Sequence, residues 1–73
     1  MPEESEAELE ALLEQLEAEE REVSALRRRI HDRLASFPNE ATQQREREIS
    51  ARRRELHNQI DEVRIRLRQA QGR

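Results

Sequence analysis

Two stretches of the chain carry the same polar residue types at the same spacings. With an offset of 26 residues, EREVSALRRRIHDRLA (20–35) aligns with EREISARRRELHNQID (46–61), and eight of the sixteen positions are identical. The polar residues of interest are Glu20, Ser24, Arg27 and His31 in the first stretch and Glu46, Ser50, Arg53, His57 and Asp61 in the second. Arg donates paired hydrogen bonds to phosphate or guanine, carboxylates accept from guanine N–H groups, and Ser or His can donate to phosphate. This inventory fits binding of a guanine nucleotide.

The spacings place each set on one stripe of a helix, because residues three and four apart are neighbours on a helix surface. Four of the residues, Glu20, Arg27, Glu46 and Arg53, also stand where the apolar periodicity expects a hydrophobic residue. A polar residue at such a position can serve to fix helix register or oligomeric state. Register requires only one polar contact, however, whereas here several residue types recur in a fixed order. We therefore favour two ligand-binding stripes, for a ligand or a pair of ligands with its own approximate two-fold symmetry.

The composition predicts the elements that must position these stripes. The chain has 73 residues, of which 33% are apolar and 42% charged, with one Phe, one Gly and no Trp, Tyr or Cys. This usage is typical of long helices and coiled coils, and a chain of this size forms at most one domain. Without Cys there is neither a disulfide nor a thiolate metal site to stabilise it. We expect an all-α protein held together by helix packing.

Local signals place two helices in a single helical-hairpin domain spanning residues 1–73. We expect helix one at about 3–36, a turn at about 37–39 and helix two at about 40–71. Ser5 with Glu8 can form a capping box near the start, and Asn39 can cap the second helix. Pro38 disfavours helical backbone at the preceding residue, and Gly72 is placed to end the second helix.

The apolar residues of both expected helices follow alternating steps of three and four, which predicts a coiled-coil seam. They are Leu9, Leu13, Leu16, Val23, Ile30, Leu34 and Phe37, followed by Ile49, Leu56, Ile60, Val63, Leu67 and Ala70. A short turn makes the helices antiparallel neighbours. The seam is narrow and has polar gaps, so we expect a homodimer, a partner protein or a ligand to supply further burial, and two hairpins could pair into a four-helix assembly.

Charge is sorted along the chain in a way that favours the antiparallel hairpin. Residues 1–22 contain ten acidic residues and one Arg, a net charge of −9, whereas residues 23–73 contain thirteen Arg and seven acidic residues, a net charge of +6. In the hairpin the acidic start lies beside the last turns of helix two, which carry Arg64, Arg66, Arg68 and Arg73. Each exposed pair contributes little, but together the pairs favour this direction.

At this point the repeated residues resemble a known family, the small anti-sigma factor RsiG of actinobacteria. Its signature is Glu-x3-Ser-x2-Arg-x3-Gln-x3-Asp. The second motif, Glu46-x3-Ser50-x2-Arg53-x3-His57-x3-Asp61, matches four of these five positions, with His in place of Gln. The first motif begins with Glu20, Ser24 and Arg27, and then has His31 and Ala35 at the Gln and Asp positions. The resemblance covers the two motifs and the hairpin layout.

The resemblance implies an antiparallel coiled coil that binds cyclic di-GMP, as an intercalated dimer, and sequesters a WhiG-type sigma factor, so that transcription by that sigma factor is repressed. It implies a better ligand site at Glu46, Ser50, Arg53 and Asp61 and a partial site at Glu20, Ser24 and Arg27. His57 and His31 can each make one hydrogen bond in place of Gln. Because Ala35 cannot accept a hydrogen bond from guanine, we expect the second helices of two chains in a homodimer to share the nucleotide.

Other function classes fit the sequence less well. A two-helix chain has no sheltered pocket, so we expect no enzyme activity. His31 and His57 lie on different helices without Cys or a metal-binding spacing, so we expect no metal. The arginines at 27–29 and 52–54 could contact nucleic acid, but the net charge of −3 and the lack of aromatic residues disfavour this. A structural or adaptor coiled coil without a ligand remains the main alternative.

The sequence also predicts where the protein works. No apolar run approaches the roughly 20 residues that a membrane-spanning helix needs. The N-terminal MPEESEAELE is acidic, unlike a signal peptide, so we expect a cytoplasmic protein without a membrane contact.

Overall fold

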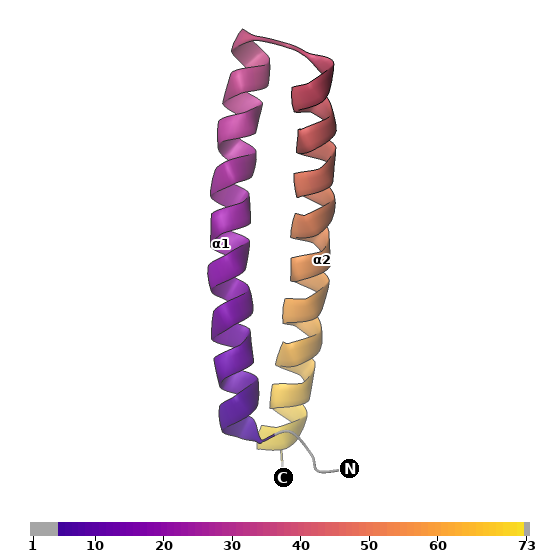
Figure 1. Cartoon of the computed structure of the whole chain (residues 1–73). Helices are drawn as coiled ribbons and strands as arrows, with labels where there is room; N and C mark the ends of the chain where they lie inside the picture. Colours follow the sequence, from indigo (N-terminus) through magenta and orange to yellow (C-terminus); the bar gives the residue numbers. More distant parts are fainter. Residues whose placement is uncertain (1–4, 73) are drawn as a thin grey trace.

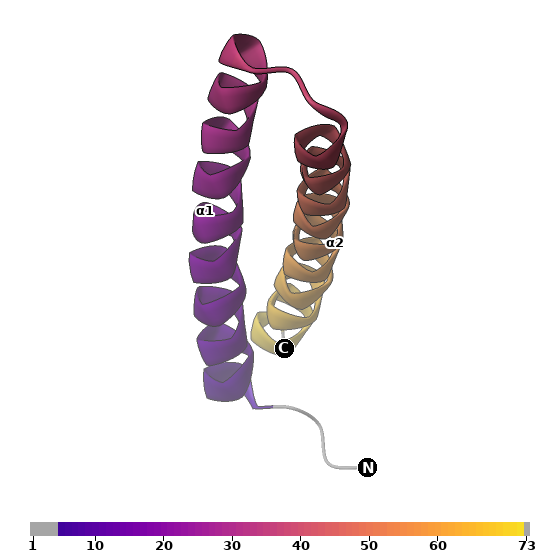
Figure 2. The same cartoon turned by 45° about the horizontal axis from the view of Figure 1, so that its top comes forward.

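Two long helices form an antiparallel hairpin in the computed structural model, which describes residues 5–72. The helices are α1 (Glu6–Ser36) and α2 (Glu40–Gln71). A 31-residue helix is about 46 Å long at 1.5 Å per residue, which accounts for a rod measuring 53 × 18 × 16 Å. The turn lies at one end of the rod, and the first turn of α1 lies beside the last turn of α2 at the other (Figure 1). The helices remain neighbours in the second view (Figure 2). The expected hairpin is confirmed.

The helix ends follow the capping signals of the sequence. Ser5 has extended backbone and its Oγ accepts a hydrogen bond from the Glu8 N–H at 3.1 Å, so α1 begins at Glu6. Residues 3 and 4, which we expected in this helix, lie outside the described residues. Asn39 caps α2 through its side-chain oxygen, which accepts from the Thr42 N–H at 2.8 Å. Phe37, which precedes Pro38, has φ −138° and ψ 79° and leaves the helix, as the proline requires.

The core is a single apolar seam between the helices. Its buried residues are Leu9, Ile30, Leu56, Ile60 and Val63, and Leu56 is completely enclosed. The other seam residues of the sequence pattern are half-buried, except Phe37, which is 72% exposed. Our inclusion of Phe37 in the seam was wrong, because helical spacing cannot be continued past the end of α1. Leu12 and Leu26, which the pattern left out, are half-buried.

Ion pairs between the helices are consistent with the antiparallel direction that charge sorting predicts. Arg64 of α2 contacts Glu17 of α1 at 2.9 Å, and Arg52 contacts Glu19 at 2.7 Å. Arg66 pairs with Glu62 on its own helix at 2.6 Å, and Arg73 lies outside the described residues. Neither helix in residues 5–72 is long and apolar enough to cross a membrane.

Candidate ligand-binding site

The hairpin brings half of each motif together with half of the other. One group, which we call the first cluster, consists of Glu20 and Ser24 from α1 and Arg53 and His57 from α2. Ser24 Oγ donates to Glu20 Oε1 at 2.6 Å, and Arg53 Nε donates to Ser24 Oγ at 2.9 Å. His57 Nε2 lies 3.1 Å from Glu20 Oε1, and Arg53 Nε lies 3.7 Å from the same oxygen. The Glu20 carboxylate is therefore the centre of the cluster.

The second cluster repeats this arrangement with the roles of the helices exchanged. It consists of Arg27 and His31 from α1 and Glu46 and Ser50 from α2. Ser50 donates to Glu46 at 2.6 Å, and Arg27 Nε donates to Ser50 Oγ at 2.9 Å. His31 Nε2 and Arg27 Nε lie 3.0 and 3.8 Å from Glu46 Oε1. The corresponding distances in the two clusters agree to 0.1 Å.

This agreement means that an approximate two-fold axis relates the clusters, passing between the helices. The axis exchanges α1 with α2 and each residue with its equivalent 26 positions away in the repeat. The residues of one motif consequently do not form one site. Glu46 and Ser50 lie in the second cluster, whereas Arg53 and His57 of the same motif lie in the first. Sequence spacing placed these residues on one stripe of α2, but the contacts run across the seam.

The two carboxylates at the cluster centres are held in the charged form. A hydrogen bond from Ser24, followed by one involving His57, keeps the pKa of Glu20 below its ordinary value of 4.5. A hydrogen bond from Ser50, followed by one involving His31, likewise lowers the pKa of Glu46. Hydrogen bonds to a carboxylate favour its ionised form. Near neutral pH each cluster therefore contains one carboxylate that neutralises much of the charge of its Arg.

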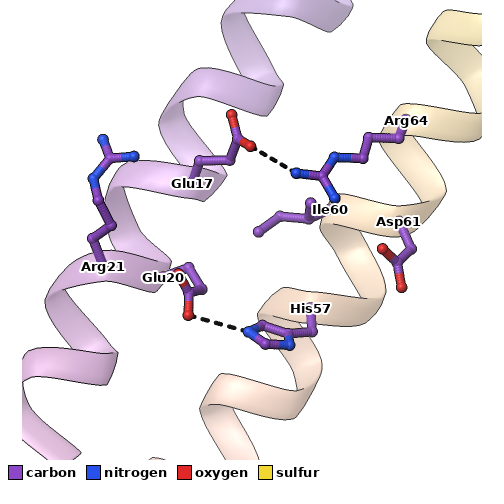
Figure 3. Close-up of a pocket in the computed structure, with 7 residues that line it drawn as sticks. All are labelled: Glu17, Glu20, Arg21, His57, Ile60, Asp61 and Arg64. Atoms are coloured by element: carbon purple, nitrogen blue, oxygen red, sulfur yellow. Dashed lines mark hydrogen bonds and ion pairs between the residues drawn. The ribbon is translucent and has the colours of Figure 1, made fainter.

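A cleft of about 310 Å³ lies beside the first cluster (Figure 3). It is lined by Glu17, Glu20, Arg21, His57, Ile60, Asp61 and Arg64. Its volume is at the lower end of the range for small-molecule sites. We call it the Asp61 cleft, because Asp61 is the member of the candidate set that has no hydrogen bond or ion pair with the described residues. Its carboxylate is a hydrogen-bond acceptor with no competing partner inside the hairpin.

Four of the lining residues, Glu17, Arg21, Ile60 and Arg64, were not among the candidate site residues of the sequence analysis. Arg64 pairs with Glu17 across the cleft, and Ile60 belongs to the buried seam (Figure 3). Arg21, one residue after Glu20, is exposed and has no ion pair among the described residues. Its repeat equivalent is Arg47, so alignment of the two stretches offered a signal for this position.

The cleft breaks the two-fold symmetry of the site. The position equivalent to Asp61 is Ala35, which is exposed and has no side-chain acceptor. The position equivalent to Arg64 is Pro38, in the turn. The first cluster therefore adjoins a charged cleft, whereas the second cluster adjoins the end of α1 and the turn.

Within residues 5–72, no group of three or more His, Asp or Glu residues is placed to hold a metal ion. The comparisons with known proteins add no relative: no family model matches the chain, and neither a curated protein nor a solved structure does.

Proposed function

We propose that this chain is a binding protein that takes up cyclic di-GMP on the face formed by the two clusters and, with the nucleotide bound, sequesters a WhiG-type sigma factor to repress transcription. The observation that supports this most is the pair of equivalent Glu, Ser, Arg and His clusters on one face, with Asp61 unpaired beside a cleft. Cyclic di-GMP itself has two equivalent guanosine halves, so it presents matching groups to a two-fold site.

The chemistry of the residues suits the halves of such a ligand. Asp61 can accept from the guanine N–H groups, and Arg53 can donate to a phosphate or to guanine O6 and N7. Arg53 donates its Nε–H to Ser24 in the free hairpin, so a nucleotide that takes this N–H as well has to replace that contact. A net hydrogen bond contributes only about 0.5–1.5 kcal/mol, which a charge-assisted bond to phosphate can offset.

A homodimer that shares the ligand is part of this proposal. Within residues 5–72, the first cluster has the unpaired carboxylate of Asp61 beside it, whereas the second cluster has Ala35 at the equivalent position. Two chains that face each other through their Asp61 clefts would restore the missing half. Sedimentation of the chain should then show a larger species with cyclic di-GMP than without it, and a monomer with bound nucleotide would contradict the dimer.

The test of the function is an isothermal titration of the purified chain with cyclic di-GMP, with GTP and cyclic di-AMP as controls. It should be run with and without a WhiG-type sigma factor. Selective binding of cyclic di-GMP, together with nucleotide-dependent binding of the sigma factor, is the expected result. Absence of nucleotide binding in both settings would rule out the ligand and leave a structural coiled coil.

Asp61→Asn is the sharpest variant for this titration. The side chain has no hydrogen bond or ion pair to lose within residues 5–72, so helicity and melting temperature should not change. A guanine N–H group that faced the carboxylate would meet a weaker acceptor, and cyclic di-GMP affinity should fall about tenfold. Asp32→Asn is the matched control, because Asp32 is also exposed and unpaired but lies outside the cleft. Equal affinities of the two variants would contradict a role for the Asp61 cleft.

A second candidate function, a ligand-free structural or adaptor coiled coil, is favoured by one specific observation. Every candidate residue except Asp61 is already bonded to another candidate residue, as the cluster contacts describe. Networks of this kind can fix the stagger of two helices. The titration separates the two functions, since a structural network has no selectivity among nucleotides.

A further inference from the structure

A second hollow lies in the turn half of the hairpin, away from both clusters. It is a groove of about 800 Å³ between α1 and α2. Leu26, Ile30 and Ala41 give it apolar walls, and Ile30 is only 6% exposed. The exposed Phe37 follows one turn after Arg33, whose carbonyl oxygen accepts the Phe37 N–H at 2.7 Å. The groove therefore has an apolar floor, and the exposed Phe37 comes four residues after Arg33 of its lining in the chain.

Three arginines, Arg29, Arg33 and Arg45, line the same groove. Their side chains make no hydrogen bond or ion pair with the described residues, and the only acid of the lining is Glu48. Glu48 accepts a hydrogen bond from Gln44 at 3.3 Å. Elsewhere on the hairpin, Arg52 and Arg64 are paired with glutamates. The groove thus has a net positive charge that the hairpin itself does not neutralise.

The groove lies on the side of the seam opposite to the clusters. Arg33 follows Ser24 by nine residues, which is two and a half turns at 3.6 residues per turn, so the two side chains point in about opposite directions from the α1 axis. A ligand on the clusters and a partner in the groove would not compete for space.

The internal repeat does not extend to this side of the hairpin. The residues that the offset of 26 aligns with Arg29, Arg33 and Arg45 are Glu55, Gln59 and Glu19. In that half, Arg52 is bonded to both glutamates, at 2.7 and 3.4 Å. The side of the hairpin with the two clusters repeats the same contacts. On the groove side, the half near the turn is basic, whereas the charges of the other half are paired. Its partner therefore has no need of two-fold symmetry.

We propose that this groove docks an acidic amphipathic helix of a partner protein. The apolar face of such a helix would cover Leu26, Ile30 and Ala41, and its flanking carboxylates would pair with the arginines. Charge complementarity favours an acidic occupant, and the apolar floor favours a helix over the phosphate backbone of a nucleic acid. The proposal goes beyond the cyclic di-GMP function and does not depend on it, because no nucleotide contact is involved.

The test uses the full chain and a synthetic helical peptide of about three heptads, with Leu on one face and Glu on the others. In NMR spectra of the labelled chain, the peptide should shift the amides of Leu26, Ile30 and Ala41 and leave Asp61 unchanged. The affinity should decrease as salt is added, because the arginines are exposed to solvent. A peptide of the same composition, reordered to have no apolar face, should not bind.

Charge reversal provides the matched variants. Replacing all three groove arginines, as R29E/R33E/R45E, should weaken peptide binding roughly 10- to 100-fold, since each exposed pair contributes modestly and reversal adds repulsion. The control is R28E/R54E/R68E, which changes the net charge equally at exposed arginines outside the groove and should weaken binding less than about threefold. Circular dichroism should show both variants to be as helical as the parent chain.

Several results would overturn the proposal. Peptide affinity that is equal in the two triple variants would mean that only net charge matters. Absence of peptide binding, or equal binding of the reordered peptide, would refute the helix as occupant. Duplex DNA that shifts the same amides more strongly would assign the groove to nucleic acid. If the chain self-associates and the R29E/R33E/R45E substitutions dissociate it, the occupant of the groove is a second copy of the chain. R29E/R33E/R45E leaves both clusters and the Asp61 cleft intact, so titration of this variant with cyclic di-GMP tests the nucleotide proposal separately.

Discussion

Replacing Arg53 or Arg27 by Ala separates a ligand-binding role of the clusters from a structural one. The two arginines are equivalent in the free hairpin. Each donates its Nε–H to a Ser Oγ at 2.9 Å, with a Glu carboxylate at 3.7 or 3.8 Å. Their side chains are 36% and 35% exposed. Two variants with such closely matched surroundings should lose the same stability.

The expected loss can be worked out from these contacts. A hydrogen bond involving a charged group contributes about 1.5–3 kcal/mol when it is sheltered. Solvent screening at side chains that are more than a third exposed reduces this, and we expect about 1 kcal/mol for each variant. For a chain of this size that corresponds to a fall in melting temperature of about 4–8 °C. The helices should still form, because neither substitution removes a buried apolar side chain.

The variants should differ once cyclic di-GMP is added. Arg53 lies in the cluster beside the Asp61 cleft, whereas Arg27 lies in the cluster whose equivalent position is Ala35. We expect Arg53→Ala to weaken nucleotide binding at least tenfold, about 1.4 kcal/mol, and Arg27→Ala to weaken it less. Thermal denaturation followed by circular dichroism gives the stabilities, and isothermal titration gives the affinities.

Three outcomes would refute this reasoning. A clearly larger loss of melting temperature in one variant than in the other would show that the clusters are not equivalent. If Arg53→Ala melted the hairpin, or if it left cyclic di-GMP affinity unchanged, the arginine would serve helix pairing and not the ligand.

Three further predictions concern the hairpin itself. The pKa values of Glu20 and Glu46 are lowered in the folded protein, so these carboxylates stabilise the fold at pH values above their ordinary pKa of 4.5. The melting temperature should therefore be nearly constant near neutral pH and fall as the pH drops below about 4.5. In melting curves recorded over a range of pH, E20Q/E46Q should show a smaller fall at acid pH. Leu56→Ala should lower the free energy of unfolding in urea by about 2–5 kcal/mol, because Leu56 is completely enclosed. Leu67→Ala should lower it clearly less, because Leu67 is half-buried, and equal losses would contradict the described core. Asn39→Ala should cost about 1 kcal/mol by removing the cap of α2, and an unchanged melting temperature would show that the Thr42 N–H finds another acceptor.

Much of the fold was predictable because it depends on local chemistry. The helix periodicity, the cap at Asn39 and the stop before Pro38 all act within a few residues, and each was confirmed. Phe37 shows the limit of this reasoning. Its spacing matched the seam, but the proline takes Phe37 out of the helix and leaves it exposed.

The candidate site was only partly predictable. Spacing identified the repeated residues and put them on one face of each helix, which needs no knowledge of the partner helix. It did not predict that Arg53 would contact Ser24 instead of the Ser50 of its own motif. That pairing depends on the stagger between α1 and α2, which is set by the packing of seam residues such as Ile30 and Leu56 against the other helix.

The sequence by itself therefore determined two capped helices, their antiparallel direction and the residue types of each stripe, since these follow from local backbone preferences, helical period and charge. Only the tertiary structure decided which side chains meet, that Asp61 remains unpaired beside a cleft, and that three arginines gather around an apolar groove on the other side. The physical reason is that contacts across the seam join residues 15–47 positions apart, and their alignment is a property of the packed pair of helices.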